Sequence, residues 1–309
     1  MLVATLIRQA QGAIPGEFVT RWTEFLSKHG YTIAHTTPLS EDSRVVDYTL
    51  RTDKDVKESV KELKAQALEF SAQSGVDVAV QEATENRKNK GLVVFDMDST
   101  LIRQEVIDLI AAYANVEVEV SKITAAAMNG EIDFNQSLQQ RVGLLKGIPS
   151  DVFEKLKDQI EFTPGAKELC RALKRQGVKL AVLSGGFIPL ANWVKDQLGL
   201  DYAYANNLAV DTDKQVLTGE TVGPIVNSSA KARLLQEIAA KEGVELDRVV
   251  AVGDGSNDLE MMAVAGYGIA FNAKPIVQQK APAKINTGSL ADVLYILGYT
   301  DKEQDLLTK

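Results

Sequence analysis

Cysteine and histidine are scarce in this sequence, and their scarcity excludes several kinds of site. The 309 residues include one cysteine, Cys170, and two histidines, His29 and His35. A single cysteine cannot form an internal disulfide, which is typical of a reducing compartment. Both histidines fall in the first quarter of the chain, far from the acidic motifs described below. A phosphohistidine intermediate and a His-ligated zinc site are therefore not expected.

Positive charge and long apolar runs are also limited. The chain has 34 Lys and Arg against 42 Asp and Glu, a formal net charge of −8. This balance argues against nucleic acid or an anionic membrane as a partner, so an anionic substrate must be held by a few local cations. No apolar run has transmembrane length, and the first residues lack the basic and apolar regions of a signal peptide. We expect a cytoplasmic protein.

Residues 1–85 are predicted to form an α+β domain of the ferredoxin-like type. The patterns run strand, helix, strand, strand, helix, strand, over Leu2–Arg8, Glu17–Lys28, Tyr31–Thr37, Arg44–Leu50, Lys54–Ser74 and Val76–Gln81. This order resembles the ACT domains, which bind amino acids and regulate metabolic enzymes. A structural role, or a homodimer through this domain, is equally compatible. The polar stretch Glu82–Lys90 is the expected linker.

The remainder is predicted to be an α/β domain with a doubly wound, Rossmann-like parallel sheet. Residues 86–103 contain the linker and the first core strand, whose apolar run ends at Phe95. Four helical patterns follow within residues 104–162, over Gln104–Ala114, Val118–Asn129, Asp133–Lys146 and Ser150–Glu161. Four helices are too many for one crossover, so we interpret them as an inserted cap.

Residues 163–309 complete this core. Expected strands are Val178–Leu183, Arg248–Val252 and Tyr267–Phe271, and Leu208–Thr221 is expected to be a β-hairpin. Expected helices are Pro164–Gln176, Ile188–Leu198, Ser229–Glu242 and Ser289–Leu297.

Three of the predicted strands end in polar side chains. Asp96 and Asp98 follow the first strand, Ser184 follows the second, and Asp254 and Asp258 follow a third. Each feature alone is explained by a turn or a helix cap. Because the carboxyl ends of parallel strands meet in one crevice, together they predict a single site.

The chemistry of these groups points to phosphoryl transfer. Asp96, Asp254 and Asp258 are hard oxygen ligands suited to Mg²⁺. Lys231 lies in the first turn of a helix expected to be capped by Ser228 or Ser229, and it supplies a cation there. One carboxylate can attack phosphorus while Asp98 protonates the leaving oxygen and then activates water. Ser184 and the amides of Gly185 and Gly186 can hold phosphate oxygens.

With these motifs in place, the chain resembles the haloacid dehalogenase superfamily. Its Asp-x-Asp-x-Thr motif matches Asp96 to Thr100, its second motif Ser184, its third Lys231, and its Gly-Asp-Gly-x-Asn-Asp motif Gly253 to Asp258. The resemblance implies a phosphatase with Asp96 as nucleophile, Asp98 as general acid and base, and Lys231 as a catalytic cation. It also implies Mg²⁺ bound by Asp96, the Asp98 backbone carbonyl and Asp254, with Asp258 bound directly or through water.

Within the superfamily, the chain is most similar to the branch that acts on phosphoserine. Phe95–Thr100, Leu183–Phe187 and Gly253–Asp258 match that branch. The resemblance implies hydrolysis of O-phospho-L-serine through a phospho-aspartate, as the last step of serine biosynthesis. The substrate-binding residues implied are Glu105 for the ammonium, Arg141 for the carboxylate, Met128 and Phe134 as apolar cap residues, and Ser184, Gly185 and Asn257.

Other functions remain open from the sequence. A broader phosphatase or a phosphotransferase of the same superfamily would use the same motifs, although Glu105 and Arg141 argue against both. A catalytically idle amino-acid sensor would depend on residues 1–85, and the intact catalytic set disfavours it. An interaction protein has no supporting feature beyond the extra domain.

Overall fold

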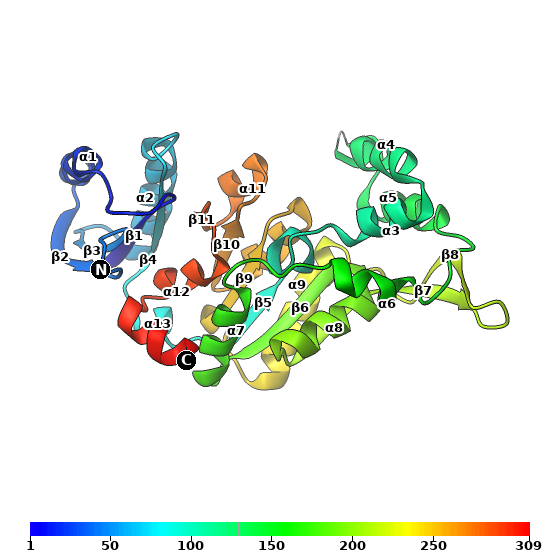
Figure 1. The fold of residues 1–309 in the computed structure, drawn as a ribbon. Helices are drawn as coiled ribbons and strands as arrows, with labels where there is room; N and C mark the ends of the chain where they lie inside the picture. Colours follow the sequence, from blue (N-terminus) through cyan, green and yellow to red (C-terminus); the bar gives the residue numbers. More distant parts are fainter. Residues whose placement is uncertain (129) are drawn as a thin grey trace.

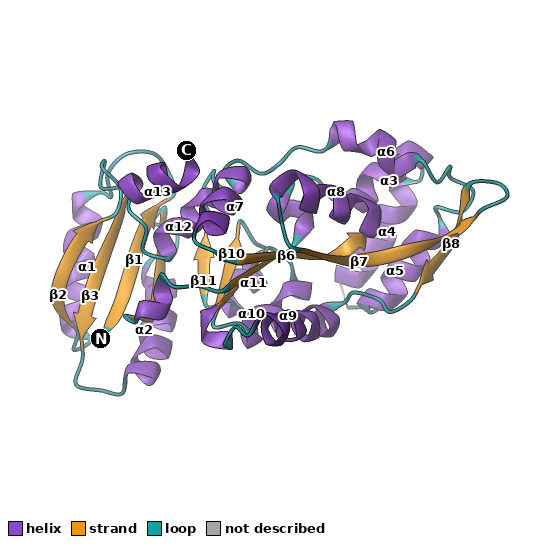
Figure 2. Ribbon diagram, turned by 90° about the horizontal axis from the view of Figure 1, so that it is seen from below, coloured by secondary structure: helices purple, strands orange, loops and turns teal. Residues whose placement is uncertain are grey.

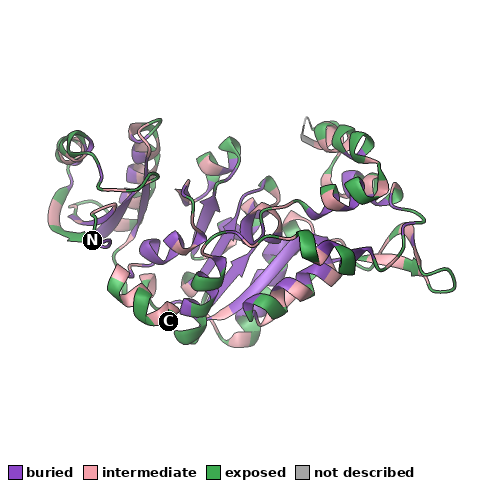
Figure 3. Cartoon of the chain, in the orientation of Figure 1, coloured by how far each residue is buried: buried purple, intermediate pink, exposed green. Residues whose placement is uncertain are grey.

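The computed structural model describes residues 1–309 except Asn129, and of Met128 the backbone alone. Figure 1 shows a small N-terminal sheet at the left, a larger central sheet in the middle and a group of helices at the upper right. In Figure 3 the strands in the middle of the central sheet are buried, whereas the outer faces of the surrounding helices are exposed. Among the described residues, no helix combines the length and the apolar character needed to cross a membrane.

The N-terminal part has the predicted ferredoxin-like order. Its elements are β1 (Leu2–Arg8), α1 (Gly16–Lys28), β2 (Thr32–Pro38), β3 (Val45–Arg51), α2 (Val56–Phe70) and β4 (Val76–Glu82). The antiparallel strands lie in the order β2-β3-β1-β4. Helix α1 buries Phe18, Trp22 and Leu26, which recur every fourth residue and therefore share one face. This apolar stripe holds the helix against the sheet.

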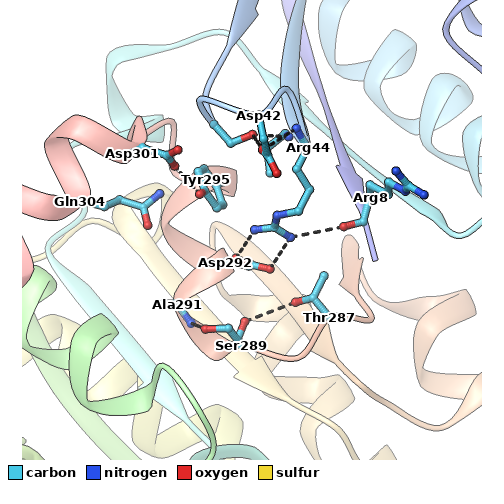
Figure 4. Close-up of polar contacts among 12 residues, drawn as sticks. Arg8, Asp42, Arg44, Thr287, Ser289, Ala291, Asp292, Tyr295, Asp301 and Gln304 are labelled. Atoms are coloured by element: carbon cyan, nitrogen blue, oxygen red, sulfur yellow. Dashed lines mark hydrogen bonds and ion pairs between the residues drawn. The ribbon is translucent and has the colours of Figure 1, made fainter. Parts of the chain in front are cut away.

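Buried polar contacts join the N-terminal part to the end of the chain. The Arg44 guanidinium donates to both Asp292 carboxylate oxygens, at 3.0 and 2.8 Å, and lies over the Tyr295 ring (Figure 4). Arg87, in the predicted linker, donates to both carboxylate oxygens of Asp47, at 2.5 and 3.0 Å. Bidentate pairs of this kind fix orientation as well as distance. The linker is therefore part of a packed interface.

The central sheet is doubly wound, as predicted. Its strands are β5 (Leu92–Phe95), β6 (Lys179–Phe187), β7 (Tyr202–Asp211), β8 (Val216–Val222), β9 (Val249–Gly253), β10 (Tyr267–Phe271) and β11 (Ala283–Ile285). They lie in the order β11-β10-β9-β5-β6-β7-β8, and all neighbours are parallel except β7 and β8. Strand β5 therefore lies in the middle, between β9 and β6.

Alternation along each strand divides the core between two helical layers (Figure 2). On β5, for example, Val93 and Phe95 face one layer and Leu92 and Val94 face the other. The first layer contains α7 (Ala166–Arg175), α8 (Ile188–Leu198) and α12 (Val293–Ile296); the second contains α9 (Ser228–Glu242), α10 (Leu259–Val264) and α11 (Pro275–Lys280). The last helix, α13 (Asp301–Thr308), packs against α7. Both faces of the inner strands are covered, so strands such as β5, β9 and β10 read as nearly continuous apolar runs.

A helical cap is inserted between β5 and α7. It consists of α3 (Val106–Ala114), α4 (Glu117–Met128), α5 (Phe134–Gly143) and α6 (Val152–Leu156), so the four-helix insertion is confirmed. The hairpin of β7 and β8 extends from the sheet to the cap. The Gly147 amide donates to the Leu217 carbonyl at 2.8 Å, and the Leu217 amide donates to Ile148 at 2.8 Å. The sequence pattern did not indicate that the hairpin forms a second connection between the central sheet and the cap.

Several predicted bounds were wrong. Strand β6 continues through Ser184 to Phe187, with a register shift, where a turn after Leu183 was expected. Strand β7 begins at Tyr202 and belongs to the sheet as well as to the hairpin. Helix α9 is capped by Asn227, whose side chain accepts from the Ala230 amide, and not by Ser228 or Ser229. The short elements β11, α10 and α11 and the terminal α13 were not predicted, because few residues define their periodicity.

Candidate active site

A cavity of about 190 Å³ lies where the carboxyl ends of β5, β6 and β9 meet the cap. Residues from both sides line it. The core contributes Asp96, Asp98, Ser184, Gly185, Gly186, Phe187, Asp254, Gly255, Ser256, Asn257 and Lys274. The cap and the segment leading into it contribute Glu105, Ile107, Thr124, Phe134, Leu138 and Arg141. The cavity therefore has an acidic floor and a wall of mixed character.

The Asp96 carboxylate is fixed at the end of the central strand. Its backbone amide still donates to Val252 of β9 at 2.9 Å, so the residue continues the sheet pairing. Its Oδ1 atom accepts from the Met97 amide at 2.8 Å and from Lys231 Nζ at 2.8 Å. Asp96 is 5% exposed. One carboxylate oxygen is thereby held in place beside the cavity.

Lys231 connects two of the acidic residues. Its Nζ atom also donates to Asp258 Oδ1 at 2.7 Å, and both side chains are fully buried. Asp258 Oδ2 in turn accepts from the amides of Asp254 and Gly255, at 3.2 and 3.0 Å. Gly253 is required here, because a Cβ atom at that position would lie 2.3 Å from Asp258 Oδ2. Lys231 and Asp258 thus form the layer beneath the cavity floor.

Burial shifts the pKa values of the acidic groups upward. Desolvation, followed by the charge of Asp258, raises the pKa of Asp96 and brings that of Asp254 to about 7. Desolvation and nearby Glu105 raise the pKa of Asp98. Burial alone would lower the pKa of Lys231, but Asp258 and Asp96 raise it above its usual value. The site therefore holds more negative charge than its single buried ammonium neutralises.

The acidic cluster formed by the cavity floor and the layer beneath it fits a divalent cation. Asp96, Asp254 and Asp258 each place a carboxylate oxygen within 4.8 Å of the other two. Three carboxylates against one ammonium leave a formal excess of two negative charges. An oxygen-only donor set with this excess matches the preference of Mg²⁺.

The loop at Ser184 brings its backbone close to the cavity. Ser184 Oγ accepts from the Gly186 amide at 2.9 Å, which leaves the hydroxyl proton free for another acceptor. Asn206 is buried and holds the loop from below by donating to the Gly185 carbonyl at 2.8 Å. A Cβ atom on Gly185 would approach Phe134 to 3.0 Å. The absence of side chains at this loop keeps the backbone near the cavity.

The cap side carries two charges of opposite sign. Glu105 Oε1 accepts from Ser99 Oγ at 2.7 Å, and Ser99 has the left-handed φ of +55°. Arg141 donates from Nε to the Ser137 carbonyl at 3.3 Å, so its two terminal amino groups point beyond its own helix. Burial lowers the pKa of Arg141, and Glu105 and Asp108 partly offset that effect. The two charged groups are available to a molecule that carries both signs.

The structure brings most of the predicted site residues together. Asp96, Asp98, Glu105, Phe134, Arg141, Ser184, Gly185, Asp254 and Asn257 line the cavity, whereas Lys231 and Asp258 lie directly beneath Asp96. The side chain of Met128 lies outside the described residues. Thr124 and Ser99, which also lie at the site, were not predicted as site residues. No sequence signal marks them, because each is an ordinary residue of a helix or turn until the fold is known.

The comparisons with known proteins agree on one family. A family model described as haloacid dehalogenase-like hydrolase matches residues 91–266, more than half of the chain. A curated relative from Saccharomyces cerevisiae, named phosphoserine phosphatase, is 54% identical over 235 residues, which cover 76% of each chain. This identity extends well beyond the short catalytic motifs.

Solved structures place the chain in the same group. A haloacid dehalogenase family hydrolase from Salmonella enterica serovar Typhi is 29% identical with a TM-score of 0.80 and covers 96% of this chain and 99% of its own. A structure titled as the phospho-aspartyl intermediate analogue of phosphoserine phosphatase is 47% identical with a TM-score of 0.63, and it covers 67% of this chain and 99% of its own. The chain therefore belongs to the phosphoserine phosphatases of the haloacid dehalogenase-like hydrolases.

Proposed function

We propose that this protein hydrolyses O-phospho-L-serine to L-serine and phosphate through a phospho-aspartate. The observation that carries the proposal is that one small cavity joins the acidic floor around Asp96 to the Glu105 and Arg141 charges. Phosphoserine carries an ammonium, a carboxylate and a phosphate, and this cavity offers a partner for each.

Asp96 is the proposed nucleophile. Its Oδ1 atom is held by the Met97 amide and Lys231, so Oδ2 is left to attack phosphorus. Attack forms the bond between Asp96 oxygen and phosphorus as the bond to the serine oxygen breaks. Lys231 neutralises charge on the attacking carboxylate, and Ser184 and the Gly185 amide bind phosphate oxygens.

Asp98 is the proposed general acid and base. Its raised pKa keeps a proton on the carboxyl, which is given to the serine oxygen as that oxygen leaves. In the second step a water attacks phosphorus, its proton passes to Asp98, and the bond between Asp96 and phosphorus breaks. Asp98 then carries the proton for the next cycle.

Asp96, Asp254, Asp258 and the Asp98 carbonyl are the proposed Mg²⁺ ligands. The excess negative charge of the floor is the reason a cation is needed there. When bound, Mg²⁺ supplies positive charge that offsets the charge on the phosphoryl oxygens. Without it, the carboxylates would repel an incoming phosphate.

The cap selects the amino-acid end of the substrate. Glu105, held by Ser99, receives the ammonium, and the free amino groups of Arg141 receive the carboxylate. Phe134 shields the reacting phosphate from bulk water, and Asn257 contacts the phosphate end. A shielding role for Met128 stays a prediction from the sequence.

The test is phosphate release from O-phospho-L-serine, phosphothreonine, phosphotyrosine and p-nitrophenyl phosphate, each with and without Mg²⁺. We expect a strong preference for phosphoserine and complete dependence on the metal. Similar rates on all four would identify a broader phosphatase and remove the roles of Glu105 and Arg141. No release from any of them would overturn the proposed function.

Four wider proposals accompany this function. We retain the division into residues 1–85, 86–103, 104–162 and 163–309, a cytoplasmic location, and a role at the end of serine biosynthesis. A homodimer through the N-terminal part is supported by β2, which lies at the edge of its sheet and is largely exposed. Sedimentation of the full chain beside a chain that begins at residue 86 tests the dimer.

A further inference from the structure

Thr124 carries a hydroxyl that forms no hydrogen bond with any described residue. It lies on α4 of the cap, and its Oγ1 atom is buried without a hydrogen-bond partner. A threonine within a helix ordinarily bonds to a carbonyl three or four residues earlier, and Thr124 does not. Leaving a buried hydroxyl unpaired is unfavourable, so an unpaired one calls for an explanation.

The position of Thr124 supplies that explanation. Among the described residues, eight buried side-chain atoms lack a partner, and only Asp98 Oδ1 and Thr124 Oγ1 belong to side chains that line the cavity. Asp98 stands on the phosphate side, where the mechanism already gives it a proton to transfer. Thr124 stands on the cap side, with Glu105 and Arg141.

We propose that the Thr124 hydroxyl donates a hydrogen bond to the substrate carboxylate and is a further specificity-determining residue. This proposal rests on the proposed function. A carboxylate accepts about four hydrogen bonds, and the Arg141 amino groups leave some of these positions open. Thr124 is a neutral donor on the same wall, and its hydroxyl has no competing acceptor in the part of the chain that the structure describes.

Charge balance favours the carboxylate over the ammonium as the partner. Glu105 already places a full negative charge in the cavity, and Ser99 occupies only one of its two oxygens. Glu105 therefore supplies the partner for the substrate ammonium. The carboxylate is offered Arg141 alone among the cap cations that line the cavity, and burial lowers the pKa of that guanidinium. A hydroxyl donor adds to carboxylate recognition without introducing another charge.

The test compares Thr124→Val with Thr124→Ser. Valine has nearly the same shape as threonine and lacks the hydroxyl, whereas serine retains it. Each variant is assayed with O-phospho-L-serine, with phosphoethanolamine, which lacks the carboxylate, and with the phosphate ester of 3-hydroxypropionate, which lacks the ammonium. Thermal unfolding of both variants is measured without substrate.

We expect Thr124→Val to raise KM about tenfold or more for the two substrates that carry a carboxylate, with a smaller change in kcat. KM for phosphoethanolamine should change less than twofold, and Thr124→Ser should resemble the wild type. Because the hydroxyl is unpaired in the free protein, the Tm of Thr124→Val should be unchanged or higher.

Three results would overturn the proposal. They are an unchanged KM for all substrates, an equal rise for all three, and a clear fall in the Tm of Thr124→Val, which would mean that the protein itself uses the hydroxyl. A wild-type enzyme that does not release phosphate from phosphoserine would instead defeat the proposed function. The two failures are therefore separated by the wild-type assay.

Discussion

Lys231 Nζ lies 2.8 Å from Asp96 Oδ1 and 2.7 Å from Asp258 Oδ1, with the lysine fully buried. One ammonium therefore serves two buried carboxylates. Removing one partner of a buried ionic group leaves uncompensated charge, which is strongly destabilising. Lys231 consequently has a structural role as well as the catalytic one proposed above.

We predict that Lys231→Met abolishes turnover and lowers the free energy of unfolding by about 3–5 kcal/mol at pH 8. The loss should be smaller at pH 5. Burial and the charge of Asp258 already raise the pKa of Asp96, and loss of the Lys231 ammonium removes the group that opposes this rise. The folded-state pKa of Asp96 in the variant therefore lies above its unfolded value, so the variant loses stability as pH rises through that range. Urea unfolding at both pH values measures this, and an equal loss at pH 5 and pH 8 would contradict it.

Asp96→Asn should reduce turnover by several orders of magnitude while leaving the fold intact. The asparagine oxygen can still accept from the Met97 amide, and Lys231 keeps Asp258 as a partner. Single-turnover assays and a circular dichroism spectrum are the measurements. If the variant retained a tenth of wild-type activity, Asp96 would not be the nucleophile.

Arg141→Ala should raise KM for phosphoserine by about 10- to 100-fold, the loss expected for a hydrogen bond to a charged group. KM for p-nitrophenyl phosphate, which has no carboxylate, should hardly change. Arg141→Lys is the matched control, since it retains the charge without the planar pair of donors. Its KM for phosphoserine should lie between those of the wild type and Arg141→Ala. Equal effects on both substrates would remove the assignment.

Ser99→Ala should raise KM for phosphoserine several-fold, because Glu105 loses the hydroxyl that holds one of its oxygens. Ser99→Gly loses the same hydroxyl but accommodates the φ of +55° without strain. The glycine variant should therefore be more stable than the alanine variant by about 1 kcal/mol, with a similar KM. A wild-type KM for Ser99→Ala would show that Glu105 does not need this support.

Lys90 gives a prediction about pH. Its side chain is buried, and its Nζ atom donates to the Asp247 carbonyl at 3.2 Å. Burial, followed by the charges of Arg248 and Arg87, lowers its pKa to about 8. In an unfolded chain the pKa of lysine is about 10.4. Between pH 8 and that value, the unfolded chain binds more protons than the folded protein, so Lys90 makes stability rise with pH.

Lys90→Met should therefore be more stable than the wild type at pH 7, by about 1–3 kcal/mol. The difference between the two proteins should shrink as the pH rises from 7 to 10. Comparing the pair cancels other groups that titrate in this range. Lys90→Arg, which stays charged, should be less stable than the methionine variant throughout. A constant difference between wild type and Lys90→Met across this range would contradict the prediction.

The sequence by itself determined the architecture of the catalytic core. Apolar runs such as that ending at Phe95 mark strands buried on both faces, and the spacing of Asp96 and Asp98 places them at the end of the central strand. Helical periodicity located the cap, and the resemblance to the superfamily implied that Glu105 and Arg141, which lie within the cap patterns, belong to the site. These features are local, so the order of residue types is sufficient to specify them.

Only the tertiary structure determined which side chains are buried and which polar groups pair with one another. The sequence indicated neither the contact of the β7–β8 hairpin with the cap nor the pairing of Arg44 with Asp292 across the chain. It gave no sign that Lys90 is buried or that Thr124, a residue lining the cavity, has an unpaired hydroxyl. Burial and pairing depend on which distant segments cover a residue. Periodicity specifies the face of a helix or strand, and the partner that meets that face is fixed only when the chain folds.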